Sequence, residues 1–239
     1  MKVLAINPNT TASMTETVLA ALREHAGDAL RFEGATAKRG TAVVASRASY
    51  AVAALSVLEV WAGFRGRTDG ILVACFGDPG VPALRELTNV PVFGLAEAAM
   101  EIASKRHRRF AVVTAGPSWV PMIDELAAGC RINGYLGTIA IDATGLSSLS
   151  EPSVFRSKMQ SAIADAERSG AEAILLGGAA LAGSASHYES AVPLLDCVAL
   201  AVETLKLGIP PRVEGPRPPG VASVGLDADL ANLLARPPV

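Results

Sequence analysis

The sequence predicts an α/β protein built from two similar lobes, each with a parallel sheet. Short buried strands alternate with helices along most of the chain, which is typical of parallel α/β folds. Two strand patterns also recur, because Lys2–Ile6 resembles Arg109–Val113 and Gly70–Cys75 resembles Ala173–Gly178. The two pairs have nearly the same separation along the chain. We therefore expect two pseudo-symmetric lobes that face each other across a cleft.

Composition excludes several classes of protein. Half of the 239 residues are hydrophobic, 18% are charged and the net charge is −2. No basic run favours nucleic acid, and no apolar segment approaches the ~18 residues of a membrane span. Met1–Asn7 lacks the features of a signal peptide, and the three cysteines are widely spaced. We expect a cytoplasmic protein without a zinc site, a disulfide framework, or nucleic-acid or membrane partners.

The first part of the chain is predicted to contain four strands and four helices. The predicted strands are Lys2–Ile6, Phe32–Thr36, Ile71–Cys75 and Val90–Leu95. The predicted helices are Ser13–His25, Arg47–Phe64, one through Val81, Leu84 and Leu87, and one beginning at Ala96. Ser13 and Glu16 form a capping-box pattern, and Pro79 is expected in the first turn of the third helix.

The second part repeats this alternation. The predicted strands are Arg109–Val113, Tyr135–Ile141, Ala171–Ala179 and Val192–Leu195. The predicted helices are one from Pro117 or Trp119 to Ala128, Glu151–Arg168 and Cys197–Leu205. The tail from Pro210 holds seven of the fifteen prolines, so we expect it to be irregular and wrapped on the surface. The predicted lobes are residues 1–95 plus 206–239, and residues 96–205.

Cys75 is the first candidate functional residue. It ends a buried strand and is followed by the turn residues Gly77-Asp78-Pro79-Gly80. The carboxyl edge of a parallel sheet is where α/β proteins bind ligands. The following helix is expected to lower the pKa of the Cys75 thiol through its free N–H groups and its dipole. From spacing alone, a purely structural role for Cys75 as a small buried hydrophobic residue is an equally good interpretation. Asp78 is expected to cap the helix that follows Cys75.

Two motifs resemble the hydantoin racemase branch of the aspartate/glutamate racemase superfamily. They are Ile6-Asn7-Pro8-Asn9-Thr10-Thr11 with Met14, and Ala74-Cys75-Phe76-Gly77-Asp78-Pro79-Gly80 with Arg85-Glu86. The resemblance extends to about residue 206. It implies two pseudo-symmetric Rossmann- or flavodoxin-like lobes and a cofactor-independent enzyme. In this family two cysteines, one from each lobe, stand on opposite faces of an acidic Cα–H next to a carbonyl.

The resemblance also implies the site residues. Cys75 is the expected acid/base, since a thiol with a pKa of ~8.5 suits both proton removal and proton delivery. The developing enolate needs oriented hydrogen-bond donors. The expected substrate-binding residues are Asn9, Ser46, Phe76, Gly77, Thr114, Ala115, Gly116, Gly178 and Ala179. Ser46 lies in a segment that departs from the family pattern. We expect a small-molecule substrate, no cofactor, no metal and a homo-oligomer.

The second strand end departs from the family pattern more strongly. Members read roughly Leu-Gly-Cys-Ala-Gly-Met, whereas this chain reads Leu176-Gly177-Gly178-Ala179-Ala180-Leu181. Gly178 thus stands where the second cysteine is expected, and neither Cys130 nor Cys197 is an obvious replacement. The leading prediction is a racemase in which a water, Ser184, Ser186 or His187 acts on the glycine side. The alternatives are a one-cysteine decarboxylase, an isomerase with Cys75 as nucleophile, and a weak binder of a small carboxylate or ureide.

Overall fold

Two four-stranded parallel sheets form the framework of the protein. The computed structural model describes residues 1–143, 147–208 and 219–235. The first sheet has the order β2-β1-β3-β4 and the second the order β6-β5-β7-β8. The strands are β1 Lys2–Asn7, β2 Arg31–Thr36, β3 Gly70–Val73, β4 Val92–Gly94, β5 Phe110–Ala115, β6 Tyr135–Ile141, β7 Ala173–Leu176 and β8 Leu194–Asp196. Each sheet repeats the strand order of the other, so the predicted α/β architecture with two lobes is confirmed.

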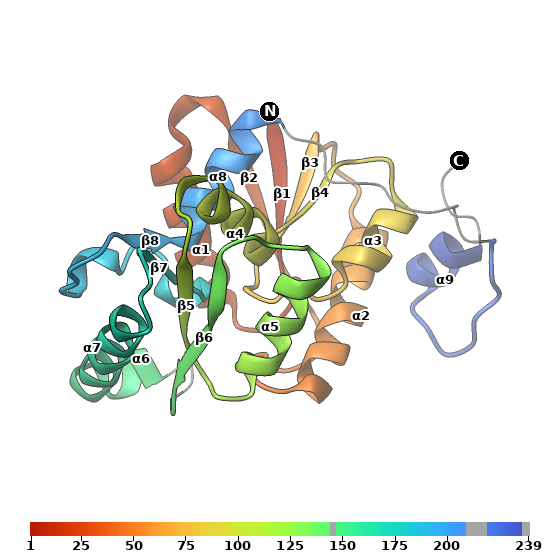
Figure 1. Ribbon diagram of the computed structural model, residues 1–239. Coiled ribbons are helices and arrows are strands. Elements are labelled where there is room, and N and C mark those ends of the chain that lie inside the picture. Colours follow the sequence, from red (N-terminus) through yellow and green to blue (C-terminus); the bar gives the residue numbers. More distant parts are fainter. Residues whose placement is uncertain (144–146, 209–218, 236–239) are drawn as a thin grey trace.

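Helices cover both faces of each sheet and give five layers (Figure 1). Helices α2 and α3 form one outer layer, and α7 forms the other. Helices α1, α4, α5 and α8 lie between the two sheets. The bounds are α1 Ala12–Ala26, α2 Arg47–Gly63, α3 Val81–Leu87, α4 Leu95–Arg106, α5 Trp119–Gly129, α6 Ser147–Ser150, α7 Pro152–Arg168, α8 Cys197–Leu207 and α9 Ala228–Ala235. Three short 3₁₀ turns cover Gly27–Ala29, Ala179–Leu181 and Ala185–His187.

The strands are apolar on both faces because both faces are covered. In β1, Val3 belongs to the core between the sheets, whereas Leu4 packs beneath the outer layer. In the second sheet, Val112 faces the central core and Val113 faces α7. Parallel strands buried in this way read as continuous apolar runs. This is why the strands could be recognised in the sequence.

Two predicted helix starts are wrong. Helix α1 begins after Thr11 and has no side-chain cap, so the Ser13–Glu16 capping box does not form. The capping box that does form opens α2. There the Ser49 N–H donates to Ser46 Oγ at 3.2 Å, and the Ser46 N–H donates to Ser49 Oγ at 2.9 Å.

The third helix also begins later than expected. Helix α3 starts at Val81, with Gly80 as its N-cap at φ +77° and Pro82 in its first turn. Pro79 therefore lies in the turn before the helix rather than inside it. Proline fits the first turn because its missing N–H has no partner there in any case, and Pro82 fills that role here.

The C-terminal tail is partly helical. Helix α9 packs against α2, with Arg65 and Asp229 2.5 Å apart and Leu230 fully buried. The prediction of an irregular tail is therefore wrong for residues 228–235, while residues 209–218 and 236–239 lie outside the described part of the chain. The assignment of the tail to the first lobe stays a prediction. In the described ranges no helix is both long and apolar enough to span a membrane.

Candidate active site

The four inner strand ends of the two sheets converge on one cavity. In each sheet the chain changes winding direction between the two central strands, β1 and β3 or β5 and β7, and ligands bind outside the carboxyl ends of strands at such a point. Asn9 follows β1, Cys75 follows β3, Thr114 is the penultimate residue of β5 and Gly178 follows β7. They line a cavity of about 100 Å³. This is several times the roughly 10–15 Å³ that one water needs, so a small ligand fits.

Most of the predicted site residues line this cavity. Those in the lining are Asn9, Cys75, Phe76, Thr114, Ala115, Gly178 and Ala179; those outside it are Ser46, Gly77 and Gly116. Ser46 is exposed and caps α2. Gly116 adopts φ +103° and supports the start of α5, because its carbonyl accepts the Trp119 N–H at 3.0 Å.

The rest of the lining is apolar. It consists of Met14, Val43, Val44, Ala74, Trp119, Phe155, Gly177, Ala180 and Leu181. Met14 belongs to the first motif of the sequence, whereas no sequence signal marks Val43, Val44 and Phe155 as site residues. Phe155 reads as an ordinary apolar position of a helix, and the two valines lie in a loop without a motif. Cys75 is therefore the one ionisable side chain among the lining residues.

Two aromatic rings pack across the boundary between the lobes, next to the cavity. The ring of Phe76 packs over Gly177, where an added Cβ would lie 2.5 Å from Phe76 Cε1. In the opposite direction, Trp119 packs over Gly77, where an added Cβ would lie 2.4 Å from Trp119 Cζ3. Each glycine thus makes room for an aromatic side chain of the other lobe. Gly77 contributes to the site through this contact rather than by lining the cavity.

Asn9 is held in one orientation by the loop after β1. Its Oδ1 atom accepts the Asn7 side-chain amide at 3.0 Å and the Thr11 N–H at 2.9 Å. The Asn7 amide is fixed in turn by Thr15 Oγ1 at 2.9 Å. Because the oxygen of Asn9 is used in this way, its amide nitrogen is the group left for a ligand, although one of its two N–H bonds already donates to Met14 Sδ at 3.4 Å. It can donate a hydrogen bond to a ligand oxygen.

The wall around Gly178 has room for a side chain but an unusual backbone. An added Cβ would lie 3.7 Å from Leu181 and 4.0 Å from Thr114 Oγ1, which are ordinary contact distances. However, Gly178 has φ +154°, a conformation that residues with a Cβ rarely adopt. The Thr114 hydroxyl donates to the Gly177 carbonyl at 2.5 Å. Cys197 is buried behind this wall, where its thiol donates to the Gly178 carbonyl at 3.7 Å.

The surroundings of Cys75 raise the pKa of its thiol to about 12, first through burial and then through the nearby Asp78 carboxylate. The expectation of a lowered pKa is therefore wrong. Helix α3 begins too far along the chain, and the N–H groups of Gly77 and Asp78 donate to the Cys75 carbonyl, at 2.9 and 3.0 Å, rather than to its thiol. The resting thiol is protonated at neutral pH.

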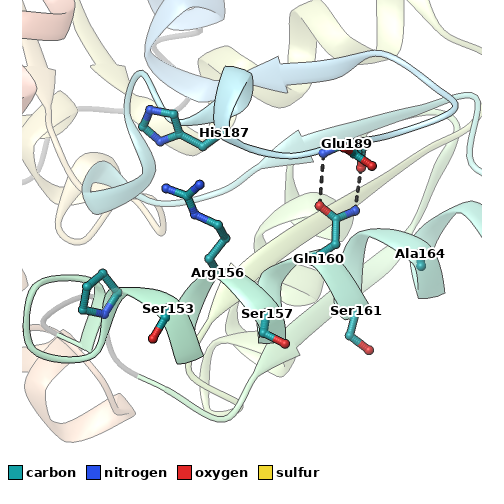
Figure 2. Close-up of a pocket in the computed structure, with 9 residues that line it drawn as sticks. Ser153, Arg156, Ser157, Gln160, Ser161, Ala164, His187 and Glu189 are labelled. Carbon is teal, nitrogen blue, oxygen red and sulfur yellow. Dashed lines mark hydrogen bonds between the residues drawn. The ribbon is translucent and has the colours of Figure 1, made fainter.

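A larger but open groove of about 940 Å³ lies elsewhere, against α7. Figure 2 shows Arg156 and His187 facing each other across it, while Gln160 exchanges two hydrogen bonds with the backbone of Glu189, at 2.6 and 3.0 Å. His187 therefore lies in this groove and outside the lining of the cavity. Ser184 and Ser186 are also absent from that lining, and the Ser184 hydroxyl donates to the Leu181 carbonyl.

The described part of the chain contains no cluster of metal-ligating side chains. In the part of the chain that the structure describes, no group of three or more histidine, cysteine, aspartate or glutamate side chains is placed to hold a metal ion. The polar groups in the lining of the cavity are the Cys75 thiol, the Asn9 amide, the Thr114 hydroxyl and backbone groups at strand ends.

Two parallel sheets with a thiol where their carboxyl edges meet define an α/β protein of the two-lobed racemase fold. Residues 3–205 match the family described as Asp/Glu/Hydantoin racemase. A hydantoin racemase from Rhizobium meliloti is 35% identical over 214 residues, which cover 85% of this chain and 86% of the relative. A hydantoin racemase from Paenarthrobacter aurescens is 31% identical over 207 residues, which cover 84% and 88%.

The fold comparison agrees with the sequence comparison. Allantoin racemase from Klebsiella pneumoniae superposes with a TM-score of 0.83 at 29% identity, over 96% of this chain and 98% of that one. The chain belongs to the Asp/Glu/hydantoin racemase family, and it is an enzyme of that racemase superfamily.

Proposed function

We propose that the protein transfers a proton at the acidic carbon of a 5-substituted hydantoin or a related amino-acid derivative, with Cys75 as the acid/base. The observation that carries this proposal is that Cys75 is the one ionisable side chain in the lining of the cavity between the lobes. The hydantoin and allantoin racemases to which the chain is similar support the choice of a cyclic or ureido carbonyl compound.

The lining favours a neutral substrate. None of the lining residues carries a charged side chain at neutral pH, so a buried carboxylate would lack an ionic partner. Burying an unpaired charge costs far more than burying a neutral amide that finds hydrogen bonds. An uncharged hydantoin ring therefore suits this site better than a dicarboxylate, and Val43, Val44 and Phe155 suit an apolar substituent.

Stabilisation of the enolate falls to neutral donors. The candidates are the Asn9 amide nitrogen and the backbone N–H groups of Gly178 and Ala179 after β7, because these residues line the cavity and the loop after β1 fixes the Asn9 side chain. Preorganised donors of this kind stabilise developing negative charge without having to reorient during the reaction.

The side of Gly178 supplies no acid or base from the lining. A proton delivered to that face of the carbon would come from water, because the adjacent Thr114 hydroxyl already donates to Gly177. Removal of the proton needs the minor thiolate form of Cys75, and the thiol that results can return a proton to the same face. We therefore expect exchange on the Cys75 face to be faster than inversion of the centre.

The test follows both events in D₂O with single enantiomers of 5-substituted hydantoins, using NMR for deuterium uptake and circular dichroism for inversion. Uptake that is faster than inversion supports the proposal. If neither occurs with any hydantoin, the proposal is wrong. Release of CO₂ from a substituted malonate would instead establish a decarboxylase, a reaction that also needs only one protonated thiol.

A further inference from the structure

Asp78 is a buried carboxyl group with no role in the proton transfer described so far. Its side chain is 2% exposed, and its backbone has φ +56°, which is uncommon for a residue other than glycine. One carboxyl oxygen accepts the Ala96 N–H at 2.9 Å, and the other accepts the Glu97 N–H at 2.7 Å. These N–H groups open α4, so Asp78 caps α4 and not α3 as expected from the sequence.

The same residue closes the turn that carries Cys75. The Asp78 N–H donates to the Cys75 carbonyl, and the Asp78 carbonyl accepts the Val81 N–H at 3.2 Å. Gly94 provides the space for the carboxyl group, since an added Cβ at this position would lie 2.2 Å from Asp78 Cγ. The Cys75 turn is thereby fastened to α4, a helix packed against α8 in the centre of the molecule.

Asp78 faces titratable groups from several elements. They are Tyr50 of α2, Arg85 of α3, Glu97 of α4, Cys130 at the end of α5, and Cys75 itself. Arg85 pairs with Glu97 at 2.7 Å and donates to the Val92 carbonyl at 3.0 Å, so these two charges offset each other. Tyr50 and Cys130 are neutral near pH 7, because burial raises both pKa values to about 12. Of these titratable groups, the Asp78 carboxylate is therefore the one whose charge acts on the Cys75 thiol.

We propose that Asp78 is a positioning residue that holds the Cys75 turn on α4 and, through its own charge, sets the pH at which the Cys75 thiol ionises. This inference rests on the proposed role of Cys75. Burial raises the pKa of Asp78 to about 7. Below that pH the thiol faces a neutral neighbour, and above it a second negative charge opposes formation of the thiolate.

The test measures alkylation of Cys75 by iodoacetamide as a function of pH, with the modified Cys75 peptide quantified by mass spectrometry. Asp78→Asn removes the charge and keeps one acceptor for the α4 N–H groups. At pH 8.5 we expect Cys75 to react at least threefold faster in this variant. Each unit by which the thiol pKa falls raises the thiolate fraction tenfold, and the accompanying loss of thiolate nucleophilicity cancels only part of this gain. Glu101→Gln, which removes an exposed charge of the same sign from α4, should leave the rate unchanged.

The wild-type protein provides a second test that no folding defect can obscure. The logarithm of its alkylation rate should rise with a slope below one around pH 7, where Asp78 ionises, and with a slope of one on either side. A uniform slope of one in the wild type, or an unchanged rate in a folded Asp78→Asn variant, would overturn the inference. Alkylation needs no hydantoin, so failure of the proposed reaction would be seen separately in the deuterium experiment.

Discussion

At the scale of single residues, Cys75 is set apart by its surroundings rather than by its type. All three cysteines have a thiol pKa raised by burial. Only Cys75 lines the cavity, whereas Cys197 is buried behind Gly178 and Cys130 ends α5. Access to a ligand therefore distinguishes the candidate catalytic thiol from the other two.

Replacing Cys75 by serine should lower the rate of deuterium uptake by 10²- to 10⁴-fold, the usual contribution of a general acid/base. A hydroxyl fills the same space but is a far weaker acid at this position. The matched control is Cys130→Ser, which should keep the wild-type rate. Wild-type uptake by Cys75→Ser would refute the catalytic assignment.

Gly178→Cys tests the empty side of the cavity. The site has room for the side chain, but φ +154° has to change or be tolerated, at a cost of about 1–3 kcal/mol in unfolding free energy. We expect the variant to be less stable and to show a higher ratio of inversion to deuterium uptake. Gly178→Ala carries the same backbone strain without the thiol, so it should lose the same stability and gain no inversion.

At the scale of elements, the contacts between aromatic rings and glycines couple the lobes next to the site. Phe76 continues from β3 and packs over Gly177 at the end of β7, and Trp119 of α5 packs over Gly77. An ion pair between Arg47 of α2 and Glu125 of α5 also joins the two lobes, but both side chains are exposed, and such pairs contribute little. The aromatic contacts therefore matter more for the shape of the cavity.

Gly77→Ala should destabilise the protein by about 1–3 kcal/mol and disturb the cavity, because the new methyl group would lie 2.4 Å from the Trp119 ring. Thermal or urea unfolding gives the stability, and the KM for a hydantoin reports the altered lining. The control is Gly129→Ala near the end of α5, where nothing lies within 4 Å of the added Cβ. Equal stabilities of the two variants would contradict the packing argument.

At the scale of the whole molecule, the buried carboxyl group of Asp78 should make the free energy of unfolding depend on pH. The pKa of Asp78 is about 7 in the folded protein and 3.8 by reference, so the folded state binds the proton more tightly than the unfolded state. The contribution of Asp78 to the free energy of unfolding is fully present below pH 3.8 and is lost as pH rises through 7. At 1.36 kcal/mol per pKa unit, this contribution amounts to about 4 kcal/mol.

This contribution can be isolated by urea unfolding between pH 4 and pH 8. The difference in unfolding free energy between the wild type and Asp78→Asn should change with pH in this window, with the wild type losing stability relative to the variant as pH rises. A difference that is independent of pH would show that Asp78 does not titrate in this range.

Local pattern explains why so much of the fold could be predicted. The runs Val3–Ile6 and Ile71–Cys75 are apolar on both faces, and helical spacing predicts Arg47–Phe64 and Glu151–Arg168, each within one residue of the observed helix. Helix ends were predicted less well, because the cap of α1 depends on loop geometry. The helix in the tail was missed because the surrounding prolines dominate the local signal.

For the site, the sequence by itself determined which groups stand at the strand ends: a cysteine and a glycine at equivalent positions, with Asn9 in the loop after β1 and Thr114 in β5. Only the tertiary structure decided which residues enclose the cavity and what state the thiol rests in. Phe155 and Val44 reach the cavity from distant segments, and Asp78 caps α4 instead of the next helix. The pKa of Cys75 rises for the same reason, because desolvation depends on every segment packed around an atom and not on the helix that follows it in the chain.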